Sequence, residues 1–162
     1  MDNPLQGSRE PELPPKFLAD AMLGRLATWL RILGYDAEYF RGEDERLIVR
    51  ARAEGRIVLT RDQATVRRRG GLRHVFVQSD HVTEQVRQVI ATLGLPPGAP
   101  TRRCLRCNTV LMARAKADVL GRVPEYVWSH HDMFWGCPAC GRIYWTGSHQ
   151  RRMDAAVRTF WS

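Results

Sequence analysis

Between residues 16 and 95, short apolar segments alternate with longer segments whose apolar residues recur at helical spacing. The alternation is typical of an α/β domain with a parallel sheet flanked by helices. We expect strands at residues 16–20, 35–40, 56–60 and 74–79. We expect helices at residues 21–34, 43–55 and 80–94, with a short helical turn that begins at residue 62 and runs into a basic loop.

The segment LPPGAPTRR at residues 95–103 breaks this alternation, and we place a domain boundary there. Residues 1–15 are rich in Pro, Gly and acidic residues and have no apolar signal core, so we expect a disordered leader. No stretch approaches the roughly 18 to 20 apolar residues of a membrane span. We therefore expect a cytoplasmic protein with no membrane partner.

Four cysteines stand in two Cys-x-x-Cys pairs, Cys104 with Cys107 and Cys137 with Cys140. Each pair can place two thiolates on one tetrahedral metal ion. The pattern predicts a closed, structural Zn²⁺ site in a small zinc ribbon, and residues 108–136 leave room for an insertion or an extended hairpin. Disulfides are the alternative, and a cytoplasmic location argues against them.

The positive charge is concentrated in the last third of the chain. Residues 101–162 carry 10 basic and 4 acidic residues, a net charge of +6, whereas residues 1–100 carry 15 basic and 13 acidic residues, a net charge of +2. Four thiolates on one Zn²⁺ would lower the total from +8 to about +6. This excess favours a polyanionic partner such as nucleic acid, although solubility alone also explains a basic surface.

Four aspartates fall at matching places in the successive strand and helix units. Asp20, Asp62 and Asp80 follow expected strands, and Asp44 precedes an expected helix. Because the carboxyl ends of parallel strands line the ligand crevice of an open sheet, we expect the four side chains to converge on one edge. The alternative for each of them is a helix N-cap. Four converging carboxylates would suit Mg²⁺ or Mn²⁺ and metal-assisted hydrolysis of a phosphodiester.

Three stretches together carry a resemblance to a known family: FLADAMLGRLATWLRILGYDA, EGRIVLTRD and CPACGRIYWTGSH. Over roughly residues 16–153, the chain resembles the Mut-seven C-terminal RNase-like family. The resemblance implies a PIN-like nuclease domain with a Rossmann-type sheet at residues 16–95 and a zinc ribbon at residues 101–153. Residues 154–162 are then expected to form a C-terminal tail.

The resemblance also implies roles for the aspartates. Asp20 matches the acid of the first strand and Asp62 the acid of the LTRD motif. Asp44 resembles the acid that opens the second helix, and Asp80 fits the acid of the last strand. In PIN-like domains such acids hold Mg²⁺ or Mn²⁺ and cut RNA, so all four are expected to be catalytic metal ligands.

Basic side chains close to both regions are candidate contacts to RNA phosphates. They are Arg25, Arg61, Arg67, Arg68, Arg69, His149, Arg151 and Arg152. Arg61 is expected either to hold the scissile phosphate or to pair with a neighbouring acid. The aromatic residues Tyr144 and Trp145 are expected either to stack on bases or to pack the small core of the ribbon.

The leading hypothesis is a metal-dependent ribonuclease whose zinc ribbon helps to dock RNA. One alternative is a non-catalytic RNA- or ribosome-binding module, and another is a toxin-type PIN nuclease. RNA is the expected partner in each case, and association with ribosomes or tRNA stays an open alternative. The sequence predicts no oligomeric state.

Overall fold

The computed structural model describes residues 13–68, 70–97 and 101–162. Arg69 and most of the expected leader therefore lie outside the described residues. The elements of the first part of the chain are β1 (Lys16–Ala19), α1 (Gly24–Ile32), β2 (Asp36–Tyr39), α2 (Asp44–Glu54), β3 (Ile57–Thr60), α3 (Gln63–Arg68), β4 (His74–Phe76) and α4 (Val82–Leu93). No helix in these described ranges is long and apolar enough to span a bilayer.

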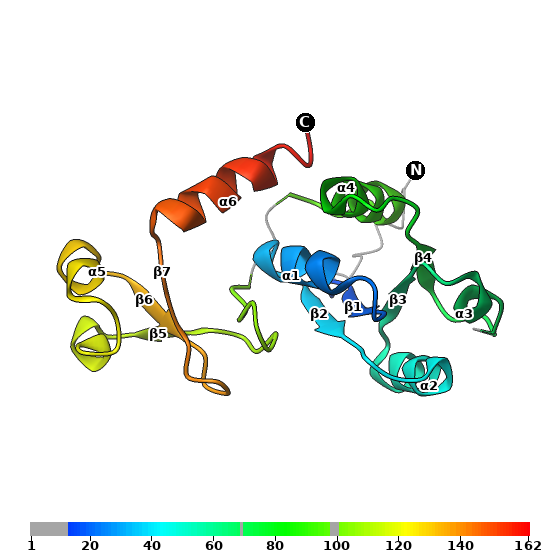
Figure 1. Cartoon of the computed structure of the whole chain (residues 1–162), viewed down its shortest axis with the longest axis horizontal. Coiled ribbons are helices and arrows are strands. Elements are labelled where there is room, and N and C mark those ends of the chain that lie inside the picture. The colour runs from blue at the N-terminus through cyan, green and yellow to red at the C-terminus, as the bar shows by residue number, and fades with distance from the viewer. Residues whose placement is uncertain (1–12, 69, 98–100) are drawn as a thin grey trace, which may run out of the picture.

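The four strands form one parallel sheet in the order β2-β1-β3-β4. The predicted α/β architecture with a parallel sheet is confirmed. Each face of the sheet is covered by helices, with α1 and α4 on one side and α2 on the other (Figure 1). The strands are apolar on both faces because both faces are buried.

Alternate side chains of the strands pack into two separate cores. Phe17, Ala19 and Leu59 join the leucines of α1 and the apolar face of α4 in the larger core. Leu18 and Val58 point the other way and pack against α2. This two-residue period fixes which face each strand residue occupies, so it also fixes the register in which the strands pair.

The last third of the chain forms a second, smaller sheet. Its three antiparallel strands are β5 (Met112–Arg114), β6 (Phe134–Gly136) and β7 (Ile143–Trp145), in that order across the sheet. Between β5 and β6 the chain inserts a 3₁₀ turn, η1 (Lys116–Val119), and a short helix, α5 (Glu125–His130). The extra length between the two cysteine pairs is therefore an insertion, as the spacing indicated.

The chain then returns to the first sheet through α6 (Ser148–Arg158) (Figure 1). The boundary expected after residue 153 falls inside this helix. Phe160 lies in the larger core, where its ring meets that of Trp29 edge to face at 5.5 Å between centroids, and the indole N–H of Trp161 donates to the Leu95 carbonyl at 2.8 Å. We propose to keep the division into a nuclease-like domain and a ribbon, with residues 154–162 assigned to the former.

The edge strand β2 is held by the turn that carries the first cysteine pair. The Asn108 Oδ1 atom accepts a hydrogen bond from the Ala37 N–H at 3.1 Å, and its Nδ2 group donates to Asp36 Oδ1 at 2.7 Å. From α1, Arg31 Nε donates to the Ala37 carbonyl at 2.7 Å, and its Nη1 donates to the carbonyls of Leu105 and Arg106. Unpaired edge groups of β2 are thus satisfied by side chains of the junction.

Asn108 holds this position with a left-handed backbone, φ 67°. The matching residue after the second cysteine pair is Gly141, with φ 75°. Asparagine is the non-glycine residue that tolerates this region best, so Asn108 serves both the turn and the junction. The hydrogen bond from Asn108 also affects the pKa of the Asp36 carboxyl. Although burial raises the pKa of that carboxyl, hydrogen bonds from Arg56 and Asn108 outweigh burial and lower it below its usual value.

We predict that Asn108→Gly lowers the free energy of unfolding by about 1–3 kcal/mol, because glycine keeps the turn but leaves buried partners unsatisfied. Chemical denaturation followed by circular dichroism measures the change. Arg106→Ala, in the same turn but with an exposed side chain, is the control and should have little effect. An Asn108→Gly midpoint equal to that of the unchanged protein would show that the junction contributes nothing to stability.

Candidate functional site

Asp20 and Asp62 flank the point where the strand order of the parallel sheet reverses. The sheet runs β2-β1-β3-β4, so the chain winds outward in opposite directions from β1 and β3. Asp20 directly follows β1, and Asp62 lies two residues after the end of β3. In open α/β sheets, ligands bind outside the carboxyl ends of the strands at such a switch point.

Thr60 joins the two aspartates through one hydroxyl group. Its Oγ1 atom donates to Asp20 Oδ2 at 2.9 Å and accepts from the Asp62 N–H at 3.0 Å. The other Asp20 oxygen accepts from the Ala21 N–H at 2.7 Å. Thr60 is fully buried at the end of β3, so it fixes the Asp20 carboxylate from the protein side. Thr60 was not predicted from the sequence. A hydroxyl residue at the end of a buried strand, directly before Arg61 and Asp62, could have indicated its role.

Asp62 is the N-terminal cap of α3, which was the alternative role for this residue. Its Oδ1 accepts from the Ala64 N–H at 2.8 Å, and its Oδ2 accepts from the hydroxyl of Thr65 at 3.0 Å. The Ala64 N–H, followed by the Thr65 hydroxyl, lowers the pKa of Asp62 and keeps it ionised. The Thr65 N–H also donates to Oδ2, at 3.3 Å, so three of the roughly four lone-pair positions of the carboxylate are used and about one is left for a cation.

The other two aspartates lie further out. Asp44 is the first residue of α2, half-buried in the first helical turn. Asp80 is 80% exposed and forms an ion pair with Arg61, which also donates to the Gln78 carbonyl. For Arg61 the structure shows the ion pair, one of the two roles expected for it.

The expected convergence of all four carboxylates is not seen as a compact cluster. Within the described ranges, a group of three or more ligand atoms that all lie within 4.8 Å of one another occurs at the cysteines, and the four aspartates form no such group. The sheet edge brings Asp20 and Asp62 together around Thr60, and Asp44 and Asp80 stand at its margins.

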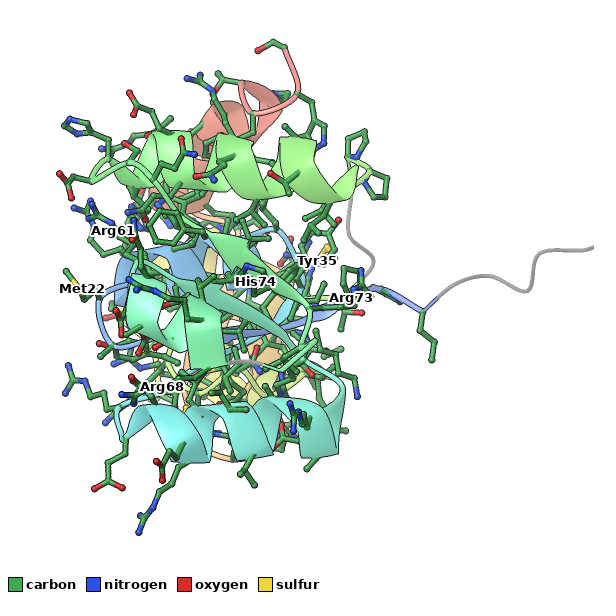
Figure 2. All side chains as sticks on the ribbon, turned by 90° about the vertical axis from the view of Figure 1, so that its right-hand side faces the viewer. Met22, Tyr35, Arg61, Arg68, Arg73 and His74 are labelled. Atoms are coloured by element: carbon green, nitrogen blue, oxygen red, sulfur yellow. The ribbon has the colours of Figure 1, made fainter. Side chains whose placement is uncertain are left out.

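The candidate phosphate contacts fall into two sets. Arg25 is exposed in the first turn of α1, and Arg67 and Arg68 are exposed at the end of α3. Figure 2 shows Arg61, Arg68 and the exposed Met22 along one edge of the sheet, with Arg73 toward the opposite edge. The second set lies in the first half of α6, which begins at the ribbon, directly after β7 (Figure 1). Its members are His149, Arg151 and Arg152, all exposed.

The four cysteines cluster as their spacing predicted, in an arrangement that could hold a metal ion. The Cys104 and Cys140 sulfurs are 3.6 Å apart, and the Cys107 and Cys137 sulfurs are 3.4 Å apart. A tetrahedron with Zn–S bonds of ~2.3 Å has edges of about 3.8 Å, so the arrangement fits a zinc-sized ion. All four cysteines are free thiols rather than disulfides.

The neighbouring groups of the cluster also shift the pKa values of its thiols. Burial raises the pKa of Cys104, but the Tyr144 hydroxyl and nearby backbone N–H groups outweigh burial and lower it to about 6. The Arg142 N–H lowers the pKa of Cys140. Burial outweighs this effect together with the sulfurs of Cys137, Cys104 and Cys107, and the pKa rises to about 11. Neighbouring thiolates repel one another, and a divalent metal ion removes that cost.

Tyr144 supports this centre through its hydroxyl group. Its hydroxyl lies 3.1 Å from Cys104 Sγ and accepts a hydrogen bond from the Leu105 N–H at 3.1 Å. Burial and the bond to Cys104 raise the pKa of Tyr144 to about 12, so the hydroxyl stays protonated. Partners of this kind orient metal ligands.

We predict that the purified protein carries a single Zn²⁺ per chain and that Cys140→Ser loses it, with a lower unfolding temperature, because structural zinc sites contribute folding free energy. Elemental analysis and thermal unfolding measure the two effects. After chelation, Zn²⁺ should restore the unfolding temperature and Mg²⁺ should not. Full zinc content in Cys140→Ser would contradict the assignment.

Comparison with protein families agrees with this geometry. The family model described as Mut7-C RNAse domain matches residues 15–157, which include the parallel sheet, the cysteine cluster and most of α6. Two further comparisons, one with curated proteins and one with solved structures, found no match. The family description indicates a nuclease-type function with RNA as the substrate. Because the match covers most of the chain, the protein belongs to the Mut7-C RNAse domain family.

Proposed function

We propose that the protein is a metal-dependent ribonuclease that hydrolyses RNA phosphodiester bonds at the edge formed by Asp20 and Asp62. The observation that carries the proposal is the Thr60 hydroxyl at the switch point of the sheet, which donates to the Asp20 carboxylate and accepts from the main-chain N–H of Asp62. The family match supports the same chemistry. Asp44 and Asp80 are proposed as outer members of the same site.

The loose spacing of the aspartates fits Mg²⁺ or Mn²⁺. Mg²⁺ retains several waters and is usually held by one or two carboxylates together with substrate phosphates, so Asp20 and Asp62 suffice as protein ligands. When bound, the ion supplies an activated water and neutralises charge on the attacked phosphate. The donors on Asp20 and Asp62 hold both carboxylates in place before the substrate arrives.

The surrounding basic groups would act on the substrate. Arg25 and the exposed arginines of α3 offer guanidinium donors to phosphate oxygens at the rim. Arg61 already neutralises Asp80, which lowers the negative charge that an approaching phosphate would meet. We propose that the ribbon holds a structural Zn²⁺ and helps to dock RNA. Zinc-bound thiolates suit the reducing cytoplasm, which we propose as the compartment.

Asp62→Asn separates capping from metal binding, because asparagine caps helices as well as aspartate but is a poorer ligand for a hard cation. We predict that Asp62→Asn and Asp20→Asn each lower Mn²⁺-dependent RNA cleavage more than about 100-fold while RNA affinity and the unfolding temperature stay near those of the unchanged protein. Cleavage of a labelled single strand and a filter-binding assay provide the measurements.

Asp118→Asn, an exposed aspartate of the ribbon insertion, is the matched control and should leave cleavage unchanged. Cleavage by Asp62→Asn and Asp20→Asn equal to that of the unchanged protein would refute the assignment of the site. It would also indicate that the observed activity comes from a contaminant.

Thr60 gives a second test, since its hydroxyl positions Asp20. We predict that Thr60→Val, which has nearly the same shape, lowers kcat by about 10–100-fold, and that Thr60→Ser retains most of the activity. The pair of variants separates the hydroxyl from the bulk of the side chain. Equal kcat values for Thr60→Val and Thr60→Ser would show that the bridge plays no part in catalysis.

One observation favours a second candidate function, a non-catalytic RNA-binding module. Asp80 is paired with Arg61, and the four aspartates form no compact ligand group. In that case RNA affinity would fall steeply with salt but would not change on removal of Mg²⁺ and Mn²⁺, and no turnover would be seen. Association with ribosomes or tRNA belongs to this candidate, and the toxin-type nuclease stays a hypothesis that no observation favours.

A further inference from the structure

A cleft lies where the end of α1, the ribbon and α6 meet, and Leu105 and Tyr144, which lie beside Cys104, also line it. Its free volume is about 60 Å³, the space of roughly two water molecules at ~30 Å³ each. The opening therefore accepts a phosphate group or the edge of a base rather than a whole small molecule. The residues that shape it include Ile32, Arg102, Arg103, Trp135, Trp145 and Met153.

The cleft presents hydrogen-bond donors that have no acceptor among the described residues, and the Arg102 side chain among them is exposed. The Arg102 guanidinium stacks on the Trp135 ring at 4.0 Å from its centroid and makes no hydrogen bond within the described ranges. Arg103 donates from Nη1 to the Asn108 carbonyl, but its Nε is buried and has no partner among the described residues. Among the lining residues that the structure describes, none is Asp or Glu.

The two tryptophans of the cleft resemble Trp29, which packs on Phe160, and differ from Trp128 and Trp161 in the state of their indole N–H groups. Trp128 and Trp161 donate their indole N–H groups to the carbonyls of Lys116 and Leu95. In the part of the chain that the structure describes, the indole N–H groups of Trp135 and Trp145 have no acceptor, and both rings are only partly buried. A half-buried tryptophan usually finds a partner for this group, so the cleft presents aromatic faces together with unmet donors.

The matching ligand has a negative charge, several acceptor atoms and a flat π surface. A nucleotide of single-stranded RNA meets all three requirements, because arginine binds phosphate through paired donors and bases stack on aromatic or guanidinium planes. An acidic peptide offers the charge but not the stacking surface.

The cleft lies at the opposite end of α1 from Asp20. Asp20 stands before the first turn of α1, and Ile32 at the other end of that helix lines the cleft. The nine residues of α1 span about 13 Å at ~1.5 Å per residue, or about four stacked nucleotides at ~3.4 Å each. RNA cut at Asp20 could therefore reach the cleft only if it extends several nucleotides beyond the scissile bond.

We propose that this cleft is a nucleotide subsite that binds RNA at a fixed distance from the scissile phosphate, with Arg102 as the phosphate contact and Trp145 or Trp135 as the stacking surface. The role of the subsite in cleavage rests on the proposed ribonuclease function. The binding of single-stranded RNA by the subsite is inferred independently, from the donors and aromatic rings of the cleft.

The test uses the full chain with Arg102→Ala, Arg102→Lys and the control Arg158→Ala, which removes an exposed arginine at the far end of α6. Affinity is measured by filter binding in the Asp62→Asn background against a single strand of about ten nucleotides and against a dinucleotide. We expect Arg102→Ala to weaken binding of the longer strand about tenfold and to lower the slope of log affinity against log salt by about 1.

Arg102→Lys should keep most of the salt slope but lose part of the affinity, because lysine keeps the charge and not the planar stack. Dinucleotide binding and all binding by Arg158→Ala should match the Asp62→Asn protein. Equal affinity of Arg102→Ala and Arg158→Ala for the longer strand would overturn the subsite, as would competition by polyglutamate as strong as that by RNA.

The same variants separate this inference from the proposed activity. If the chain with Asp62 intact cleaves RNA and Arg102→Ala cleaves long and short strands equally well, the subsite is refuted and the ribonuclease stands. If no variant cleaves but Arg102→Ala still loses affinity for the longer strand, the ribonuclease is refuted and the subsite stands.

Discussion

The parallel pairing of β1 with β3 is the constraint on which the candidate site depends. Ala19 lies opposite Leu59, and the ladder continues one residue further, where the Asp20 N–H donates to the Leu59 carbonyl at 3.0 Å. This register sets Asp20 beside Thr60, and therefore beside Asp62. A slip of one residue would exchange the side chains of a strand between the two buried faces of the sheet, so the packing of the two cores and the geometry of the site are maintained by the same contacts.

A second interaction ties the metal centre to this sheet. The turn that carries Cys104 and Cys107 presents Asn108 to the backbone of β2, and Arg31 closes the junction from α1. Loss of the metal would therefore loosen an edge of the nuclease-like sheet as well as the ribbon. The cleft proposed as a nucleotide subsite lies at this same junction. In this account the ribbon is both a support for the sheet and a second surface for RNA.

Much of the fold could be predicted from the sequence, because hydrophobic periodicity reports burial directly. The strands around Phe17 and Leu59, the helices that cover them and the cysteine cluster were all predicted in this way. Thr60 and Asn108 were not predicted because their roles depend on contacts with residues far away in the sequence. Those contacts follow from the strand register and the tertiary packing, which a local sequence pattern does not determine. The boundary predicted after residue 153 falls inside α6, because the polar start of this helix gives no sign of the apolar contact made later by Phe160.

The central claim is that Asp20 and Asp62 hold the catalytic cation. Crystals grown with Mn²⁺ and measured for its anomalous scattering test it most directly. The account predicts an anomalous peak within bonding distance of both carboxylates, beside the Thr60 hydroxyl, and none at the same place in crystals of Asp20→Asn. An anomalous map without a Mn²⁺ peak at this edge of the sheet, or with a peak only at the cysteines, would contradict the claim.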